Sequence, residues 1–359
     1  MSDLSTNPVR VAALGLGYWG PNLARAWSGL EDTQLAWLCD IDEGRLDRLG
    51  RQFQEARVTR DFDEVLADET VEAVSIATSA PTHAALALRA IDAGKHVFVE
   101  KPLALTSADA RAMATAAERA GVLMVVGHLL VHHPGVAKLK QLVDTGELGR
   151  THYLYSNRQN LGQVRSDENA LWSLGAHDIS VMLHLVGELP ESVSAQGQCF
   201  IHEGIEDVVF GTLRFPSGVI AHMHLSWMDP FKMRKMTIVG SEKMAVFDDM
   251  NPDEKVKIFN KGVTHSGNGN GNGREWQPAS YGEYVQLRHG DTYIPRISSE
   301  EPLRIQCRHF ARCVRGLEEP RAGAAQGLAV VEVLEALQRS LDNNGAVQAF
   351  DASLVAGPA

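Results

Sequence analysis

The sequence predicts an α/β domain with a doubly wound parallel sheet, followed by an α+β domain with an antiparallel sheet. Three observations predict this fold class. Apolar runs alternate with helical stretches along the first third of the chain, as in parallel sheets. Strand-like segments joined by tight turns follow one another later, as in antiparallel sheets. The length of 359 residues also suits about two domains, which we place at residues 1–127 and 128–359.

The alternation begins with Val9–Leu14, an unbroken apolar run that is typical of a buried parallel strand. Gly94 and Gly121 are good helix terminators, and Thr106 or Ser107 can cap the helix that ends at Gly121. The expected strands are Val9–Leu14, Gln34–Asp40, Val71–Ala77, Val97–Glu100 and Leu123–Val126. The expected helices are Pro21–Leu30, Arg45–Phe53, Thr82–Ala93 and Ser107–Ala120.

The pattern changes after Gly127, where strands follow one another without long helices between them. Pro216–Gly218 and Gly240–Ser241 are turn sequences that join consecutive strands. The expected strands are Val208–Phe215, Val219–Trp227, Lys235–Val239 and Met244–Asp248. The expected helices are Gly135–Asp144, Ala170–Val186, Leu303–Gly316 and Gly323–Asn343. The low-complexity segment Gly267–Gly273 has little to pack into a core and predicts a mobile loop.

Composition and charge argue against several classes of protein. The net charge of −11, with no block of Lys or Arg, is unlike that of a nucleic-acid binder. No apolar run approaches the ~18 residues that cross a membrane, and Met1–Arg10 lacks the apolar core of a signal peptide. Cys39, Cys199, Cys307 and Cys313 show no metal-binding spacing and fit reduced thiols. We therefore expect a soluble cytoplasmic protein with no metal site and no membrane partner.

A glycine-rich turn, Gly15-Leu16-Gly17-Tyr18-Trp19-Gly20, joins the first expected strand to the first expected helix. A GxGxxG pattern in this context is typical of dinucleotide binding. Gly15 permits the tight turn, Gly17 lets a pyrophosphate approach the backbone, and Gly20 lets helix and strand pack closely. The free N–H groups and the dipole at the helix N-terminus favour the phosphates. The pattern predicts a Rossmann domain.

An aspartate, Asp40, stands at the end of the second expected strand, twenty residues past Gly20. At this place a carboxylate hydrogen-bonds the ribose hydroxyls of NAD and repels the 2′-phosphate of NADP. Asp42 adds to the repulsion, whereas the charge of Arg45 acts against it. The sequence therefore predicts NAD as the cofactor.

The tripeptide Glu100-Lys101-Pro102 lies at the carboxyl end of the fourth expected strand. Ligands of open parallel sheets bind at the carboxyl edge, so we expect Lys101 to point toward the nicotinamide. The peptide bond before Pro102 is a candidate cis bond, because X–Pro bonds adopt cis far more often than others.

These motifs resemble those of the glucose-fructose oxidoreductase/inositol dehydrogenase family (Gfo/Idh/MocA), over nearly the whole chain. The other segments that carry the resemblance are Ala77-Thr78, Thr82-His83, Ala93–His96 and Gly175–His177. It implies a Rossmann domain and a domain with a large, open antiparallel sheet, through which relatives often form dimers or tetramers. The positions that it assigns to the cofactor are Gly15, Gly17, Tyr18, Trp19, Gly20, Asp40, Thr78, His83, Glu100 and Lys101.

The resemblance also implies a catalytic pair, since the lysine of Glu-Lys-Pro and a histidine on a later helix serve the reacting hydroxyl in such enzymes. These residues are Lys101 and His177 here. An ammonium can polarise the substrate oxygen, and an imidazole of ordinary pKa, ~6.5, can accept the hydroxyl proton. Many relatives carry an aspartate four residues before this histidine, where this chain has Ser173. Asp178 cannot simply replace it, because adjacent helical residues point ~100° apart.

The remaining histidines of this region are expected to be structural more often than catalytic. Two of them, His128 and His133, are also candidates to line the cofactor site. The full set is His83, His96, His128, His132 and His133.

Several segments resemble the nucleotide-sugar branch of the family, namely Tyr18–Asn22, Gly146–Gly149, Asn160–Gly162, Asn169–Trp172 and Gly204–Asp207. The resemblance implies oxidation of the 3-hydroxyl of UDP-N-acetylglucosamine, to a 3-keto sugar that an aminotransferase then takes. A UDP-sugar needs cations for its diphosphate and often an aromatic face for its uracil. The candidate substrate residues are Arg158, Asn160, Arg165, Trp172 and His177, with Lys232, Arg234 and Lys235 as further cations. A plain surface charge, or a core position for Trp172, explains these residues too.

Other functions use the same residues and stay open. UDP-N-acetylglucosaminuronate would need one more cation for its carboxylate, and the sequence does not locate one. A 3-ketosugar reductase would run the reaction in the other direction, and a small-polyol dehydrogenase would have no nucleotide subsite. A non-catalytic dinucleotide-binding regulator is the alternative of another class, but the presence of both Lys101 and His177 argues against it.

Overall fold

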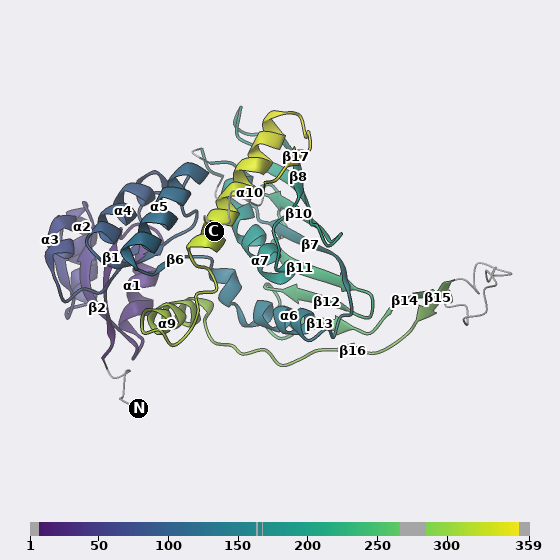
Figure 1. The fold of residues 1–359 in the computed structure, drawn as a ribbon, viewed down its shortest axis with the longest axis horizontal. Coiled ribbons are helices and arrows are strands. Elements are labelled where there is room, and N and C mark those ends of the chain that lie inside the picture. The colour runs from purple at the N-terminus through teal and green to yellow at the C-terminus, as the bar shows by residue number, and fades with distance from the viewer. Residues whose placement is uncertain (1–6, 163, 167, 266–284, 352–359) are drawn as a thin grey trace.

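The protein is described by a computed structural model that covers residues 7–162, 164–166, 168–265 and 285–351. It consists of two lobes, each built around one sheet (Figure 1). The glycine-rich segment at 267–273, for which the sequence predicts a loop, lies outside the described residues.

The first lobe contains a six-stranded parallel sheet, as the sequence predicts. The strand order is β3-β2-β1-β4-β5-β6, so the order reverses between β1 and β4. Ligands of doubly wound sheets bind outside the carboxyl ends of the strands at such a point. The strands are β1 (Val9–Leu14), β2 (Thr33–Cys39), β3 (Arg57–Thr59), β4 (Ala73–Ile76), β5 (His96–Val99) and β6 (Met124–Val126).

Helices cover the parallel sheet, and several begin with a side-chain cap. Asp42 accepts a hydrogen bond from the backbone N–H of Arg45, and Thr106 accepts one from that of Asp109. Gly121 ends α5 in the left-handed conformation that favours glycine. The helices are α1 (Gly20–Ser28), α2 (Glu43–Gln52), α3 (Phe62–Ala67), α4 (His83–Asp92) and α5 (Ser107–Ala120), with the 3₁₀ turn η1 (Ala80–Thr82).

The second lobe contains a nine-stranded sheet in the order β16-β13-β12-β11-β7-β10-β9-β8-β17. Its neighbouring strands pair antiparallel, as expected, except that β7 and β10 run parallel, so the sheet is mixed. The strands are β7 (Thr151–Gln159), β8 (Ser192–Gln198), β9 (Val208–Arg214), β10 (Ile220–Ser226), β11 (Met233–Gly240), β12 (Met244–Asp248), β13 (Val256–Phe259), β16 (Thr292–Tyr293) and β17 (Gln348–Ala349).

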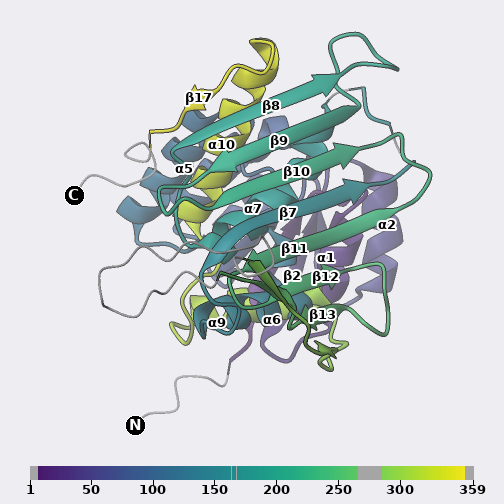
Figure 2. The ribbon, with the colours of Figure 1, turned by 90° about the vertical axis from the view of Figure 1, so that its right-hand side faces the viewer.

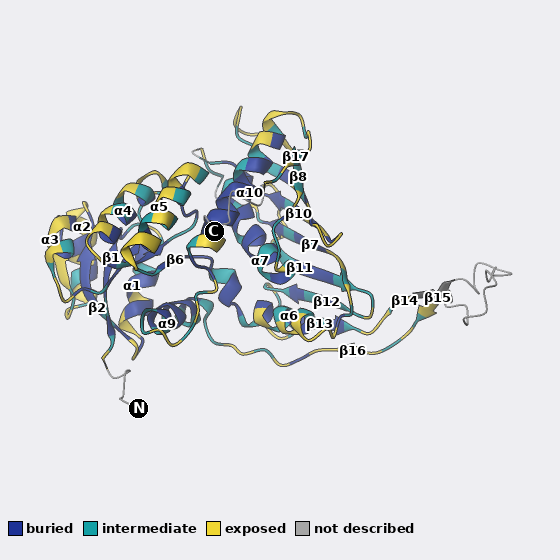
Figure 3. Ribbon diagram, in the orientation of Figure 1, coloured by how far each residue is buried: buried dark blue, intermediate teal, exposed yellow. Residues whose placement is uncertain are grey.

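Helices cover only one face of the mixed sheet. α6 (Pro134–Asp144), α7 (Ala176–Val186) and α10 (Ala324–Asp342) lie between this sheet and the first lobe, where much of their surface is buried (Figure 3). Among the described residues, no helix lies over the opposite face (Figure 2). Tyr153 and Phe210 are each 45% exposed on β7 and β9. Pairing of two copies through this face, which the family resemblance implies, stays a prediction.

The chain returns to the first lobe near its end. Leu303 and Phe310 of α9 (Pro302–Val314) pack in the same core as β1 and α1, and Phe310 lies edge-on to Trp27. The predicted second domain, residues 128–359, includes α9, whereas in the structure α9 packs on the first lobe. α10 contacts both α5 and β8 and so links the lobes.

The chain between β13 and β16 carries a two-stranded antiparallel ladder. Its strands are β14 (Gly262–His265) and β15 (Val285–Arg288), and it extends away from both lobes (Figure 1). Within the described ranges, no helix is long and apolar enough to cross a membrane.

Candidate active site

The fingerprint loop between β1 and α1 is packed so tightly that glycine is required at two positions. Gly15 has a φ of +88°, and a Cβ on it would lie 2.6 Å from the backbone nitrogen of Thr78. A Cβ on Gly20 would lie 2.0 Å from the carbonyl oxygen of Gly15. Any side chain at either position would therefore push the loop off β4 or push α1 off β1.

The third glycine faces open space. The nearest atom that a Cβ on Gly17 would meet is Nη1 of Arg45, at 3.7 Å. The backbone at Gly17 and the N-terminus of α1 thus remain accessible to a pyrophosphate, which is the fit that a bound NAD requires. Tyr18, next to it, is 88% exposed.

Asp40 sits at the end of β2 with its carboxylate fixed by backbone groups. Oδ2 accepts a hydrogen bond of 2.5 Å from Leu16 N–H, and Oδ1 accepts one of 2.9 Å from Asp42 N–H. Arg45 lies 3.5 Å from both Asp40 and Asp42, so two carboxylates neutralise the cation whose charge acts against the preference for NAD. Ile41 is 82% exposed beside Asp40 and offers an apolar surface to an adenine ring; an exposed isoleucine after the strand-end aspartate is the signal that sequence reasoning missed.

Changing Asp40 to Asn is expected to relax the preference for NAD. The amide oxygen still accepts from Leu16 N–H, but the charge that repels a 2′-phosphate is gone. We expect the ratio of the dissociation constants of NADPH and NADH to fall about tenfold or more, because close charge pairs near a surface interact by several kcal/mol. Fluorescence titration of both cofactors measures this ratio. Asp47→Asn on α2 is the control, and an unchanged ratio in Asp40→Asn would contradict the assignment.

The loops after β4 and β5 are tied together by His83, which is 1% exposed. Its Nδ1 lies 2.9 Å from the carbonyl oxygen of Pro102, and its Nε2 lies 3.1 Å from that of Thr78. The structure thus places His83 between two backbone carbonyls at the edge of the predicted cofactor site. The Oγ1 atoms of Thr78 and Thr82 are 2.7 Å apart, and the Lys101–Pro102 peptide bond is cis.

Glu100 is buried next to Lys101, whose backbone N–H donates a hydrogen bond to the Glu100 carboxylate. Burial raises the pKa of Glu100 to about 7, while hydrogen bonds from the Lys101 backbone and the Trp19 side chain favour its charged form. A Cβ on Gly127 would lie 2.8 Å from the Glu100 carboxyl group, so only glycine leaves space for it. Trp19 and Glu100, both predicted cofactor residues, therefore contact each other. Gly127 was missed, because a glycine after a strand carries no chemical signal in sequence.

Lys101 reaches across to the second lobe. Its Nζ donates a hydrogen bond of 3.2 Å to the carbonyl oxygen of Ser173, which lies in the single π-helical turn η3 (Leu171–Gly175) ahead of α7. Such turns occur often at functional sites. Burial lowers the pKa of Lys101, opposed by the charges of Glu168 and Glu100. Ser173, the position at which the family resemblance implies an aspartate in many relatives, thus offers its backbone carbonyl to Lys101.

His177 lies in the first turn of α7, beside Lys101. Burial, followed by the charge of Lys101, lowers the pKa of His177 well below its usual value. The same causes lower the pKa of His128 to about 3. Lys101 Nζ donates to the carbonyl oxygen of Ser173, four residues before His177, and its charge lowers the pKa of both imidazoles, so these three groups lie near one another at the seam between the lobes. The structure therefore brings together the predicted catalytic pair, with His177 neutral near pH 7 and able to accept a proton.

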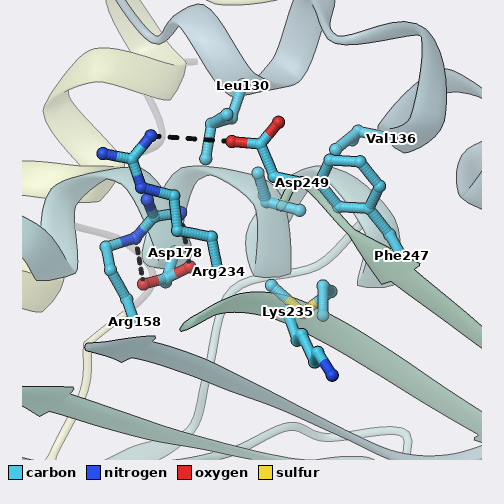
Figure 4. A pocket seen from close by; sticks show the side chains of 10 residues that line it. Leu130, Val136, Arg158, Asp178, Arg234, Lys235, Phe247 and Asp249 are labelled. Carbon is cyan, nitrogen blue, oxygen red and sulfur yellow. Dashed lines mark hydrogen bonds and ion pairs between the residues drawn. The ribbon is translucent and has the colours of Figure 1, made fainter. Parts of the chain in front are cut away.

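The candidate substrate cations are paired with carboxylates. Arg158 is buried and makes a bidentate pair with Asp178, with Nε–Oδ2 and Nη2–Oδ1 distances of 2.8 and 3.0 Å (Figure 4). Figure 4 also shows Arg234 with Asp249, 3.6 Å apart, in the same small pocket. The remaining pairs are Arg165 with Glu168 at 3.0 Å and Lys235 with Asp248 at 3.1 Å. Lys232 is exposed.

The other two predicted substrate residues have structural contacts. Trp172 packs against the cores of both lobes, and its indole Nε1 donates to Oε1 of Gln338 at 3.2 Å. The backbone N–H of Asn160 donates to the carbonyl oxygen of Ser226 at 3.0 Å, which ties the loop after β7 to the end of β10.

Comparison with known families matches both lobes. Residues 9–128 match a family model described as "Oxidoreductase family, NAD-binding Rossmann fold", and residues 136–246 match one described as "GFO/IDH/MocA C-terminal domain". The first lobe is therefore an NAD-binding Rossmann domain, and NAD is its cofactor.

Individual relatives agree with these matches. D-apiose dehydrogenase from Paraburkholderia graminis is 26% identical over 340 residues, which cover 90% of this chain and 85% of that protein. The crystal structure of a candidate oxidoreductase from Magnetospirillum magnetotacticum is 33% identical, with a TM-score of 0.76 over 92% of this chain and 100% of that one. UDP-N-acetylglucosamine 3-dehydrogenase from Acidithiobacillus ferrooxidans, at 22% identity and a TM-score of 0.78 over 94% and 99%, shares the fold. The chain belongs to the Gfo/Idh/MocA family of oxidoreductases.

Proposed function

We propose that the chain is an NAD-dependent dehydrogenase that oxidises a secondary hydroxyl of a sugar. One observation carries the proposal: a lysine ammonium and a neutral imidazole lie together at the carboxyl edge of the parallel sheet. An alcohol oxidation needs this pair, because one group must orient the hydroxyl and another must take its proton. The similarity to D-apiose dehydrogenase supports a sugar as substrate.

Lys101 binds and orients the hydroxyl oxygen. Its ammonium has three donors, of which Ser173 O takes one. The others are free to donate to the substrate oxygen, where they stabilise negative charge that develops as the proton leaves. The charges of Glu168 and then Glu100 raise the pKa of Lys101, which burial lowers.

His177 takes the proton. Its pKa lies well below the usual value, so the ring is neutral and carries one basic nitrogen near pH 7. Nδ1 is buried without a hydrogen-bond partner in the described part of the chain, which leaves Nε2 to face the hydroxyl. When NAD is bound along Gly17, Trp19 and Asp40, its nicotinamide ring supplies the acceptor for the hydride.

For the finer assignment we propose UDP-N-acetylglucosamine, oxidised at its 3-hydroxyl. The loop between β10 and β11 supports a nucleotide subsite, because Phe231 is 72% exposed there and Lys232 follows it. This loop adjoins the one after β7, since Leu161 N–H donates to Asp229 O at 2.6 Å. An exposed ring and a cation suit a uracil and a phosphate. The 3-keto product would be a substrate for an aminotransferase, and we propose a homodimer or homotetramer formed through the open sheet face.

A substrate panel tests both levels of the proposal. Purified protein with NAD is given UDP-N-acetylglucosamine, its uronic acid, free N-acetylglucosamine or myo-inositol, and NADH absorbance is followed with a reagent that traps ketones. We expect NADH with UDP-N-acetylglucosamine, at a rate at least about tenfold above that with the free sugar, equal to roughly 1.4 kcal/mol of additional binding. Equal rates would contradict the nucleotide subsite alone. Tight NAD binding without NADH from any sugar would favour a non-catalytic protein.

A further inference from the structure

A row of histidines leads away from the catalytic pair, and the proposed function leaves it without a role. His128 stands at the start of the 3₁₀ turn η2 (Leu129–His132), and His132 ends it. η2 packs against α7, which carries His177, and against α9, which carries His309. The turn therefore lies between the candidate active site and the outer helix of the first lobe.

The middle of this row is buried and polar. His128 is 2% exposed and His132 is 1% exposed. Both ring nitrogens of each, together with Nδ1 of His177, are buried without a hydrogen-bond partner in the described ranges. Buried polar atoms are nearly always paired with protein or with ordered water. Because no protein group among the described residues fills this role, ordered water is the expected partner of these nitrogens.

The far end of the row reaches solvent. The ring centroids of His132 and His309 are 5.0 Å apart. Nε2 of His309 accepts from Arg321 N–H at 3.2 Å, so its proton sits on Nδ1, which donates to Oε2 of Glu318 at 2.6 Å. The Glu318 side chain is 32% exposed. His309 can therefore pass a proton to the Glu318 carboxylate, and Glu318 can pass it to the solvent.

The reaction supplies the proton that such a row would carry. Each hydroxyl that is oxidised gives up a hydride, with two electrons, to the nicotinamide, and one proton to His177. Resting on the proposed function, we propose that His177, His128, His132 and His309, with bridging water, pass this proton to Glu318 and the solvent. A proton enters His177 at Nε2 while the proton on Nδ1 leaves toward His128, so the ring is neutral again with its proton on Nε2. A shift of that proton back to Nδ1, by a ring flip or through water, restores the starting tautomer before the next turnover.

The charges around the row disfavour a protonated histidine, so a proton that enters the row is not held by a buried ring. Burial and the charge of Lys101 lower the pKa of His177 and His128, and burial lowers that of His184 to about 4. The groups that face the row are Lys101 from the loop after β5, Arg158 from β7, Arg234 from β11, His184 from α7, Lys140 and Asp144 from α6, Arg312 and Cys313 from α9, and Glu318 and Arg321 from the loop that follows. Burial and these mostly cationic groups make an imidazolium unfavourable at His177, His128 and His132, whereas Glu318 favours it at His309.

The test separates NADH formation from proton release. His132→Phe keeps a ring of similar size and removes both nitrogens. In a stopped-flow experiment with NAD and whichever panel sugar the unmodified chain oxidises, we expect the first turnover of NADH to keep its rate in the variant. Proton release to a pH indicator should lag at least about tenfold behind it, within the range of proton-transfer effects. His222→Phe, on the exposed face of β10, is the control and should show no lag.

A second readout needs neither cofactor nor substrate. In ¹⁵N-histidine NMR spectra of the protein alone, the ring N–H of His128 should exchange rapidly with water in the unmodified chain and slowly in His132→Phe. If His132→Phe fails to fold, Glu318→Gln replaces it, because the amide oxygen still accepts from His309 but cannot take the proton. Proton release in step with NADH, or unaltered His128 exchange, would overturn the relay. Absence of NADH from the unmodified chain would overturn the proposed function, and the exchange measurement would still decide on the relay.

Discussion

Lys101→Met lowers kcat at least about 100-fold, while NAD still binds. Methionine has a similar length but no donor, so the substrate oxygen loses the ammonium that orients and polarises it. The cofactor contacts at Gly17 and Asp40 lie on other loops and are untouched. Steady-state rates with the panel sugar, fluorescence titration with NADH, and a thermal melt measure the three quantities. Lys261→Met, at an exposed position, is the control.

The role of Lys101 also predicts how activity changes with pH. Burial lowers the pKa of Lys101, so the ammonium is lost at a lower pH than for a free lysine. Activity that depends on the ammonium is present below that pKa and declines as pH rises through it. In Lys101→Arg the charge persists to higher pH, so the alkaline decline should move upward even if kcat is low. A near-normal rate in Lys101→Met would remove the residue from the mechanism.

His177→Asn also lowers kcat by about 100-fold or more, because no other neutral imidazole lies in its place to accept the hydroxyl proton. The lowered pKa of His177 means that it is protonated only well below the usual range. Oxidation by the unmodified chain should therefore persist as pH falls through ~6.5, where an ordinary histidine would become inactive. A rate profile from acid to neutral pH, with His152→Asn on β7 as the exposed control, tests both statements. An acid decline centred on the ordinary histidine pKa would show that His177 is not held neutral.

Much of the fold could be predicted because the apolar patterns of its elements are strong. β1, β12 and α5 have the predicted bounds, since each is an apolar run or a capped helix with clear ends. The central strand β7 was missed. Its core-facing residues are Leu154, Ser156 and Arg158, so the apolar alternation that identifies a strand is absent. Arg158 can be buried only because Asp178 of α7 neutralises it, and a contact between distant segments is not visible in sequence.

Some residues of the candidate site could likewise be predicted from the sequence, and others could not. The fingerprint, Asp40 and Lys101 follow strands whose carboxyl ends meet, so topology alone gathers them. His177 came from a family resemblance, since no local pattern marks a catalytic histidine on a helix. The carbonyl of Ser173 as partner of Lys101 depends on a π-helical turn, which propensities do not predict. Trp172, which the sequence predicts as a substrate residue, packs between the lobes. Its indole N–H donates a hydrogen bond to Gln338, a residue far away in the sequence.

A crystal structure of the protein with NAD and UDP-N-acetylglucosamine tests the central claim most directly. The account predicts that Lys101 Nζ and His177 Nε2 both lie within about 2.6–3.2 Å of one sugar hydroxyl, whose carbon faces C4 of the nicotinamide. If either side chain were out of hydrogen-bond reach of that hydroxyl in the closed complex, the dehydrogenase mechanism would be contradicted and only the dinucleotide-binding scaffold would stand.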